Sequence, residues 1–360
     1  MKVIQIVTQM EAGGAQGVAC CLHDGFAAAG LHSELWFLYQ KRASHTGPRI
    51  RSLAAHRPGP LGTVGLLLRL WWWLRREAPD CVMTHTHYAN VIGLLLAKLA
   101  FVKRRIAVQH NPSATYPSFA RTLDRIWGTL GIYTSIVAVC DTVVHSLAGY
   151  PKIYQRRVRR IYNGSQSGAA ILRSEARSAL NIPADRLLLL NVGRLSKQKN
   201  QQVLLRTLAE MPDAFLIIAG DGELRNELIS QARNFAVEDR VHFAGEVGRD
   251  RLAQFLSAAD LFVFPSRFEA MPLAVLEALH YGLPVVASDI PALSEILAGS
   301  GVLVAGDDPH VWSRTISGLL KDAGLCHALR HKGRVRAADF SVPQMIHHYL
   351  QLIRLSEQRA

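Results

Sequence analysis

Two glutamates in the C-terminal half of the chain, Glu269 and Glu277, are separated by seven residues within PSRFEAMPLAVLEALHYGLPVVAS. Glu269 stands at the expected entrance of a helix, and Glu277 lies inside it. A helix N-terminus exposes unpaired N–H groups and a partial positive charge, so it attracts phosphate and other anions. An unpartnered carboxylate on an otherwise apolar segment is costly. The pattern therefore indicates either functional acids at an anion-binding helix start, or a capping acid followed by a solvated glutamate.

Two basic residues, Arg194 and Lys199, lie upstream within GRLSKQKN, directly after an expected strand at Leu187–Val192. Arginine offers a planar fork to two phosphate oxygens, and lysine offers a compact charge on a flexible stem. Because they are five residues apart on one loop, both side chains can converge on a diphosphate. The alternative role for each is ordinary surface solvation.

The elements that must position the glutamates are a strand, a loop, a helix and a second strand. The run Leu261–Phe264 is short, apolar and typical of a strand buried on both faces. After a polar loop at 266–269, the dipeptide Met271-Pro272 is a helix-start signal. Gly282 and Pro284 end the predicted helix before the next strand at Val285–Ala287.

The glutamate segment resembles the donor-site motif of the retaining nucleotide-sugar glycosyltransferases of family 4, and GRLSKQKN resembles a second motif of that family. The resemblance covers nearly the whole chain. It implies an α/β fold with two facing Rossmann-like domains, the glycosyltransferase-B arrangement, with an interdomain cleft and a C-terminal crossover helix. The predicted divisions are an acceptor-side domain at 1–164, a linker at 165–186, a donor-binding domain at 187–340, and a helix at 341–360 that packs back on the first domain.

The resemblance also implies a role for each residue that matches the family pattern. Glu269 would bind hydroxyls of the donor sugar, and Glu277 would bind the ribose hydroxyls. Gly245 resembles the turn that approaches the nucleotide base. The leaving diphosphate would be held by the side chains of Arg194 and Lys199. The backbone amides at the helix start, at Ala270, Met271 and Leu273, would bind it as well.

The N-terminal half contributes a glycine pair and a histidine. A strand at Val3–Val7 followed by Gly13-Gly14 and a helix is typical of nucleotide-binding α/β domains, although two glycines also make ordinary turns. In the family this loop faces the cleft where donor and acceptor meet, and Gln16 stands where an acid is usual. His110 follows another expected strand and matches a family histidine that faces the donor sugar; its alternative role is structural.

No metal ion or cofactor is expected. His85 and His87 would lie on one face of a strand, which is one spacing for a metal pair, but histidines at a strand end are more often hydrogen-bonded. No two aspartates form the Asp-x-Asp pattern with which many transferases hold a divalent metal. The nucleotide sugar is a substrate.

Size and composition agree with a two-domain globular protein. The chain has 360 residues, 49% hydrophobic and 19% charged, and its 41 basic and 28 acidic residues give a net charge of +13. This charge favours anionic partners without choosing among them. Five scattered cysteines, no signal-peptide pattern and no long apolar run indicate a cytoplasmic protein.

The segment GLLLRLWWWLRREAPD, residues 65–80, combines tryptophans with arginines at helical spacing. A helix of this kind is typical of a membrane interface, and the Arg69–Arg76 region is therefore a candidate contact with the inner leaflet. The alternative is a core helix, although the three adjacent tryptophans Trp71, Trp72 and Trp73 cannot all point inward.

The predicted function is retaining, metal-independent transfer of a sugar from a nucleotide donor to a glycan acceptor, which we expect to be lipid-linked, in surface polysaccharide or lipopolysaccharide biosynthesis. A peripheral position on the cytoplasmic face of the inner membrane fits this function. Two other enzyme or protein classes share the fold, a non-hydrolysing sugar-nucleotide epimerase and a non-catalytic scaffold. Nucleic acid is not expected as a partner, because clustered aromatic and basic stacking sites are missing outside Trp71–Trp73.

Overall fold

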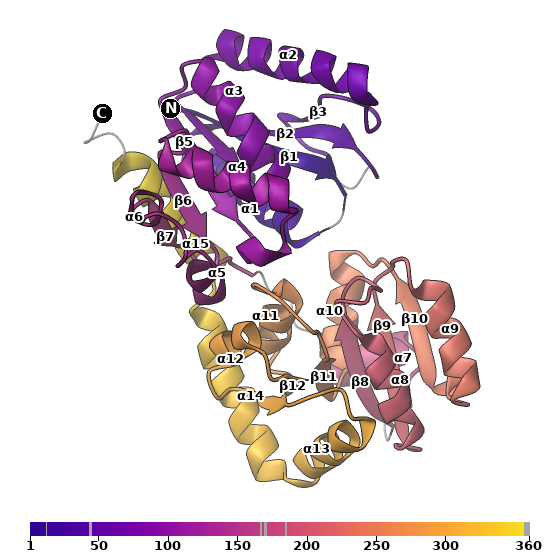
Figure 1. Ribbon diagram of the computed structural model, residues 1–360. Helices are drawn as coiled ribbons and strands as arrows, with labels where there is room; N and C mark the ends of the chain where they lie inside the picture. The colour runs from indigo at the N-terminus through magenta and orange to yellow at the C-terminus, as the bar shows by residue number, and fades with distance from the viewer. Residues whose placement is uncertain (12, 43–44, 166–167, 169–170, 184–185, 356–360) are drawn as a thin grey trace. The chain divides into compact units, whose positions relative to one another are not determined.

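The computed structural model describes residues 1–355 except 12, 43–44, 166–167, 169–170 and 184–185. The chain forms two compact units (Figure 1). Unit 1 comprises residues 1–164 together with the terminal segment from Val342, and unit 2 comprises Ser165–Ser341. Each unit is a parallel sheet with helices on both faces, so the prediction of two Rossmann-like α/β domains is confirmed.

The sheet of unit 1 has the strand order β3-β2-β1-β4-β5-β6-β7. The side chains of its first strand along the chain alternate between the two faces of the sheet, with Ile4 and Ile6 packing on one face and Val7 on the other. The strands are β1 (Lys2–Met10), β2 (His32–Gln40), β3 (Ile50–Ser52), β4 (Cys81–Thr84), β5 (Arg104–Gln109), β6 (Ser135–Ala138) and β7 (Val158–Arg160).

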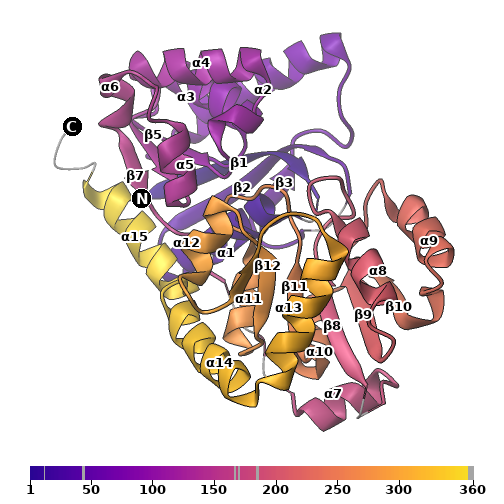
Figure 2. The ribbon, with the colours of Figure 1, turned by 60° about the horizontal axis from the view of Figure 1, so that its bottom comes forward.

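Two helical layers cover this sheet, as Figure 2 shows. The layer against Ile4 and Ile6 consists of α2 (Pro60–Glu77), the π-helix η1 (Ala89–Gly93), α3 (Leu94–Leu99) and α4 (Ser118–Thr129). The other layer consists of α1 (Gly14–Ala28) and the terminal helix α15 (Val342–Leu355), which contact each other. Three short helices complete the unit: η2 (Ser113–Thr115), α5 (Asp141–Ser146) and α6 (Lys152–Gln155).

The sheet of unit 2 has the order β10-β9-β8-β11-β12-β13. Its core strands are continuous apolar runs, because both faces are covered by helices. The strands are β8 (Leu187–Val192), β9 (Ala214–Ala219), β10 (Val241–Gly245), β11 (Leu261–Phe264), β12 (Val285–Ser288) and β13 (Val302–Val304). The helices are α7 (Arg173–Ala179), α8 (Gln201–Ala209), α9 (Arg225–Asn234), η3 (Glu238–Arg240), α10 (Arg249–Ala258), α11 (Leu273–His280), α12 (Pro291–Leu297), α13 (Pro309–Lys321) and α14 (Ala323–Ala338).

Part of the segment predicted as a linker, residues 165–186, packs into unit 2. Its helix α7 lies against α10. The buried side chain of Arg177 donates to Asp260 at 2.7 Å, and Asp260 also accepts from the backbone N–H of Leu188 at 2.8 Å. This ion pair fixes α7 to the beginning of β8 and of β11.

Both sheets reverse their strand order at one place, between β1 and β4 in unit 1 and between β8 and β11 in unit 2. Ligands of open parallel sheets bind beyond the carboxyl ends of the strands at such a switch point. The residues predicted to be functional follow β1 and β5 in unit 1, and β8 and β11 in unit 2, and Gly245 is the last residue of β10. Within the described part of the chain, no helix is long and apolar enough to cross a membrane.

Candidate active site

The loops that follow β8 and β11 are joined to each other at the switch point of unit 2. The backbone N–H of Arg267 donates to the carbonyl of Gln198 at 2.9 Å. The side-chain amide of Gln198 donates in return to the carbonyl of Phe268 at 2.8 Å. Because of these two bonds, the basic loop and the first glutamate of the acidic motif share one rigid surface.

This surface brings Lys199 and Glu269 into contact. The ammonium group of Lys199 donates to Oε1 of Glu269 at 2.6 Å and lies 4.8 Å from the ring centre of Phe264. Glu269 is only 8% exposed. It does not cap the following helix, because α11 begins at Leu273 after Pro272 and has no side-chain cap. The interpretation of Glu269 as a capping acid is therefore wrong, and its partner is the lysine.

Arg194 is exposed on a turn that glycine residues hold in place. Gly193 donates to the carbonyl of Ala219 at 2.9 Å, and Gly220 donates to the carbonyl of Gly245 at 2.7 Å. Gly220 has a φ of 141°, and a Cβ there would lie 2.0 Å from the carbonyl oxygen of Gly193. The ends of β8, β9 and β10 are thus linked through backbone atoms, which places the turn at Gly245 beside the loop that carries Arg194.

The remaining predicted contacts of unit 2 lie on or just before α11. Ala270 and Met271 are buried, and Leu273 is the first helical residue. Glu277 lies one turn further, on a helix whose other inward residues are apolar. Burial raises the pKa of Glu277 from 4.5 to about 7, and the nearby positive charge of Arg249 opposes that rise. The second glutamate is therefore a partly desolvated carboxyl group that can change its protonation near neutral pH.

In unit 1, the glycine pair begins helix α1. Gly13 is the N-cap residue and Gly14 the first helical residue, and a Cβ on Gly14 would meet nothing within 4 Å. Gln16, which replaces the acid usual in the family, is buried, and its amide donates to the carbonyl of Gln9 at 3.4 Å. Gln16 thus points back at the end of β1.

The two histidines after β4 point in different directions. β4 ends at Thr84, so His85 and His87 do not share a strand face as predicted; His87 lies two residues before η1. The ring of His87 packs against Tyr116, with ring centres 5.1 Å apart. His85 instead contacts His110, with Nδ1 of His85 3.2 Å from Nε2 of His110. Among the described residues, no three His, Cys, Asp or Glu side chains gather as a metal site requires.

Two contacts of the site were not predicted from the sequence. Asp307, from the loop after β13, accepts from Asn200 at 2.9 Å and pairs with Arg267 at 3.2 Å. Gln5, in the middle of β1, contacts His85 at 2.8 Å. A polar side chain inside an apolar strand is the signal that identifies Gln5, whereas nothing local marks Asp307, because its partners are 40 and 107 residues away.

Comparison with known proteins identifies two family profiles in the chain. The profile "Glycosyltransferase Family 4" matches residues 12–165, and the profile "Glycosyl transferases group 1" matches residues 173–336. Together they include every residue that the sequence predicted for the site.

Relatives and solved structures extend this likeness to most of the chain. The lipopolysaccharide core biosynthesis glycosyltransferase LpsE of Rhizobium meliloti is 30% identical over 296 residues, which cover 81% of this chain and 81% of the relative. HepE from Anabaena, solved with UDP and glucose, has a TM-score of 0.82 at 18% identity and covers 97% of this chain and 99% of its own. WaaG, a glycosyltransferase involved in lipopolysaccharide biosynthesis, has a TM-score of 0.79 at 17% identity, with 98% and 99% covered.

Proposed function

The chain belongs to the family 4 glycosyltransferases, and from this we propose that it transfers a sugar from a nucleoside-diphosphate donor to a glycan acceptor with retention of the anomeric configuration. The observation that carries the proposal is the contact of Lys199 with Glu269 at the switch point of unit 2. A cation for the diphosphate and a carboxylate for sugar hydroxyls are held there on two loops that are bonded to each other.

In the proposed reaction, the bond between the anomeric carbon and the diphosphate oxygen breaks while an acceptor hydroxyl forms the new bond from the same side of the sugar. The hydroxyl proton passes to the departing diphosphate, so no enzyme nucleophile is needed. Negative charge grows on the leaving group, and fixed positive groups stabilise it. Arg194, Lys199 and the amides at the start of α11 supply that stabilisation, so the proposed transfer needs no metal ion.

The other matched residues have subsidiary roles in this proposal. Glu269 and His110 contact the donor sugar, Glu277 accepts from the ribose hydroxyls, and Gly245 borders the base. The glycine pair of unit 1 lets a substrate approach the start of α1. LpsE and WaaG act in lipopolysaccharide biosynthesis, and HepE was solved with UDP and glucose. These relatives favour a nucleotide sugar as donor and a cell-surface polysaccharide or lipopolysaccharide as product.

The test compares two lysines of the same loop. Lys199→Ala removes a charge from the leaving group, and we expect the release of nucleoside diphosphate to slow by about 100-fold or more. Lys197→Ala is the matched control, because Lys197 is exposed on the same loop, and it should leave the rate unchanged. Full activity of Lys199→Ala and of Arg194→Ala would contradict the proposed site.

Three further measurements complete this test. The donor is identified first, by stabilisation of the protein against heat with UDP-, GDP- and dTDP-sugars. NMR of the product then reports the anomeric configuration, and an inverted product would contradict retention. A chelator should not alter the rate. Isomerisation of the donor in the absence of any acceptor would indicate the epimerase of the same fold instead.

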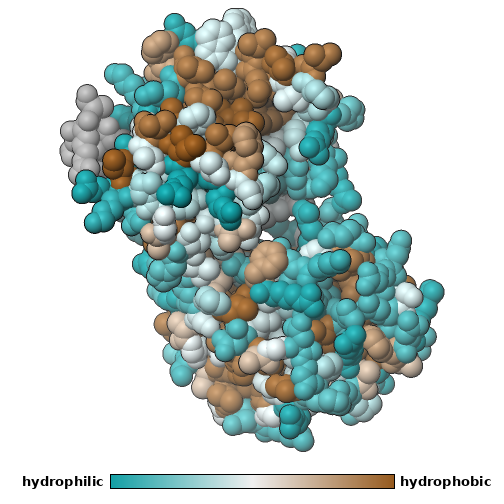
Figure 3. Space-filling view, in the orientation of Figure 1, coloured by the Kyte–Doolittle hydropathy of each residue, from teal (hydrophilic) through white to brown (hydrophobic). Residues whose placement is uncertain are grey.

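We also propose that the acceptor is lipid-linked and that unit 1 binds the cytoplasmic face of the inner membrane through the outer surface of α2 to α4. Leu66, Leu70 and Leu74 of α2 are buried, whereas Leu68, Trp71 and Trp72 are exposed on its outer face. Figure 3 shows apolar side chains gathered over these helices. Together, the exposed apolar side chains of this surface are Leu61, Val64, Leu68, Trp71, Trp72, Leu99, Phe101, Phe119, Ile126 and Leu130.

The charges of this surface suit an anionic membrane. The guanidinium of Arg75 lies 4.7 Å from the ring centre of Phe101, and that of Arg76 lies 5.3 Å from Trp72. The two acids of α2 and α4 face elsewhere, because Glu77 pairs with Lys2 and Asp124 is buried. A helix with apolar and aromatic residues beside arginines is typical of the membrane interface, and each basic residue near an anionic surface contributes about 1 kcal/mol.

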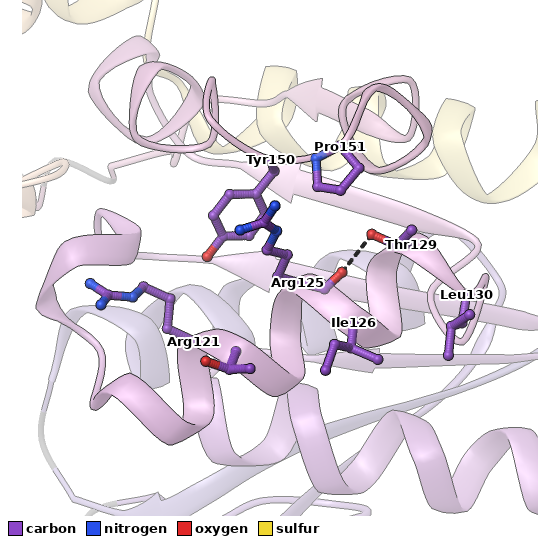
Figure 4. A pocket seen from close by; sticks show the side chains of 8 residues that line it. Arg121, Arg125, Ile126, Thr129, Leu130, Tyr150 and Pro151 are labelled. Carbon is purple, nitrogen blue, oxygen red and sulfur yellow. Dashed lines mark hydrogen bonds between the residues drawn. The ribbon is translucent and has the colours of Figure 1, made fainter.

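A shallow groove along α4 belongs to the same surface. It has a volume of about 610 Å³ and is lined by Arg121, Thr122, Arg125, Ile126, Thr129, Leu130, Tyr150 and Pro151. Figure 4 shows the guanidinium of Arg125 over the Tyr150 ring, 6.0 Å from its centre. Cationic groups next to exposed apolar walls fit a lipid headgroup with the first carbons of its chains.

Sedimentation with lipid vesicles tests the membrane contact independently of catalysis. We expect binding to vesicles that contain anionic lipid, weaker binding at high salt, and little binding to neutral vesicles. Leu68→Glu should weaken binding by at least 10-fold, whereas Leu325→Glu, on an exposed position of α14, should not change it. Equal binding of both variants and of the unchanged protein would contradict this contact.

A further inference from the structure

Three side chains form a hydrogen-bonded row at the switch point of the unit 1 sheet. Gln5 lies in β1, His85 follows β4 and His110 follows β5. Oε1 of Gln5 is 2.8 Å from Nε2 of His85, and Nδ1 of His85 is 3.2 Å from Nε2 of His110. Gln5 and His85 are fully buried. The row therefore runs from the interior of the sheet to the residue that the family pattern places against the donor sugar.

The hydrogen-bond partners define where the protons of the row lie. An amide oxygen only accepts, so Nε2 of His85 must carry the proton in its bond with Gln5. A neutral imidazole has one N–H, which makes Nδ1 of His85 an acceptor. Nε2 of His110 must then donate to it. The second ring nitrogen of His110, Nδ1, is left as an acceptor for another group.

The surroundings keep both rings neutral. Burial, together with the neighbouring ring of His110, holds the pKa of His85 well below 6.5, and burial lowers the pKa of His110 to about 4. The other titratable side chains at these strand ends are directed to different partners. His87 packs against Tyr116, and Asp124 accepts from Gln109 at 2.8 Å.

We propose that His85 is a positioning residue, oriented by Gln5, that holds His110 in the tautomer whose Nδ1 accepts a hydrogen bond from a hydroxyl of the sugar. The identity of that ligand rests on the proposed function. The chemical consequence does not depend on the proposed function. With this tautomer, His110 recognises a hydrogen-bond donor, such as the hydroxyl of a carbohydrate, and disfavours a group that only accepts.

The tautomer can be measured on the free protein without any substrate. Correlation of ring ¹⁵N and ¹H shifts at pH 7 distinguishes protonated from unprotonated imidazole nitrogens, and the spectrum of His110→Gln assigns the signals of His110. We expect an unprotonated Nδ1 and a protonated Nε2. A protonated Nδ1 would overturn the proposal. Because no turnover is involved, this result is separate from the success or failure of the proposed transferase activity.

Gln5→Glu tests the direction of the hydrogen bonds in this row through the pH dependence of activity. The new carboxylate raises the pKa of His85. Below that pKa, His85 carries a proton on both nitrogens and its Nδ1 donates to Nε2 of His110, which forces the opposite tautomer on His110. We expect the acidic limb of the kcat/KM profile to move to higher pH by about one unit or more. An unchanged limb would overturn the proposal.

The matched control for Gln5→Glu is His23→Gln. His23 is a buried histidine of the same unit, lies 3.0 Å from the hydroxyl of Ser33, and has no contact with the row. It should leave the pH profile unchanged.

Two replacements of His85 separate positioning from packing. Asn places an acceptor oxygen near the position of Nδ1, so His85→Asn should retain the tautomer of His110 and most of kcat. His85→Phe fills the space without an acceptor, and we expect kcat to fall by about 10-fold or more while the KM for the donor changes little. A folded His85→Phe variant with unchanged kcat would contradict the proposal. If that variant does not fold, the spectrum of the unchanged protein still decides the tautomer.

Discussion

At the scale of single residues, Glu277 links the stability of the protein to pH. Its pKa is 4.5 in an unfolded chain and about 7 in the fold, because burial disfavours the charged form. The unfolded chain therefore releases this proton at lower pH than the folded protein does. As pH rises from about 4.5 to about 7, this group lowers the free energy of unfolding, and above pH 7 the loss is complete.

Glu277→Gln removes that titration. We expect the variant to be more stable than the unchanged protein at pH 8, by on the order of 2 kcal/mol, and equally stable near pH 4. Urea unfolding at both pH values measures the difference. In the unchanged protein, the affinity for the nucleotide should rise with pH through 7, since the proposed ribose contact needs the carboxylate. A stability difference that is the same at both pH values would contradict this account.

At the scale of elements, the backbone bonds between the ends of β8, β9 and β10 form the floor of the proposed donor site. Gly220 is the residue on which they depend, because its φ of 141° and its 2.0 Å approach to the Gly193 carbonyl exclude any side chain. Gly220→Ala must displace the backbone that carries Arg194. We expect a loss of about 2–3 kcal/mol in stability and of nearly all donor binding.

The matched control is Gly248→Ala. Gly248 is at the start of α10, where a Cβ would meet nothing within 4 Å, so this substitution should alter neither thermal stability nor nucleotide affinity. Differential scanning calorimetry with and without nucleotide measures both effects. Equal behaviour of the two alanine variants would show that the close approach at Gly220 does not hold the site together.

The elements themselves were largely readable from the sequence, since buried parallel strands are continuous apolar runs and the helices between them have clear start signals. Leu187–Val192 and Leu261–Phe264 are strands with the predicted bounds. The contact between Lys199 and Glu269 was not readable, because 70 residues separate them and only the sheet order makes their loops neighbours. Helix α14 was also missed, since eight of its sixteen residues are Arg, Lys, His or Gly and its apolar stripe is weak.

At the scale of the whole molecule, the chain returns to unit 1 after completing unit 2. Val342, Met345, Tyr349 and Ile353 of α15 are buried, and a side chain on Gly25 of α1 would collide with Ile346. The backbone N–H of Gly164 donates to the sulfur of Met345 at 3.1 Å. Unit 1 is therefore incomplete until the last helix has been added, although all seven strands of its sheet lie within the first 160 residues.

This organisation predicts that damage to α15 lowers the stability of unit 1 alone. Ile353→Ala deletes buried atoms and should cost about 2–4 kcal/mol, whereas Arg354→Ala, on the exposed side of the same helix, should cost less than about 0.5 kcal/mol. Proteolysis of Ile353→Ala should cleave first within residues 1–164 and spare 187–341. A nucleotide that binds unit 2 should protect only the second region, because a ligand stabilises the unit that holds it. If both units lost resistance together, the fold would melt as a single cooperative body and the terminal helix would not belong to unit 1 energetically.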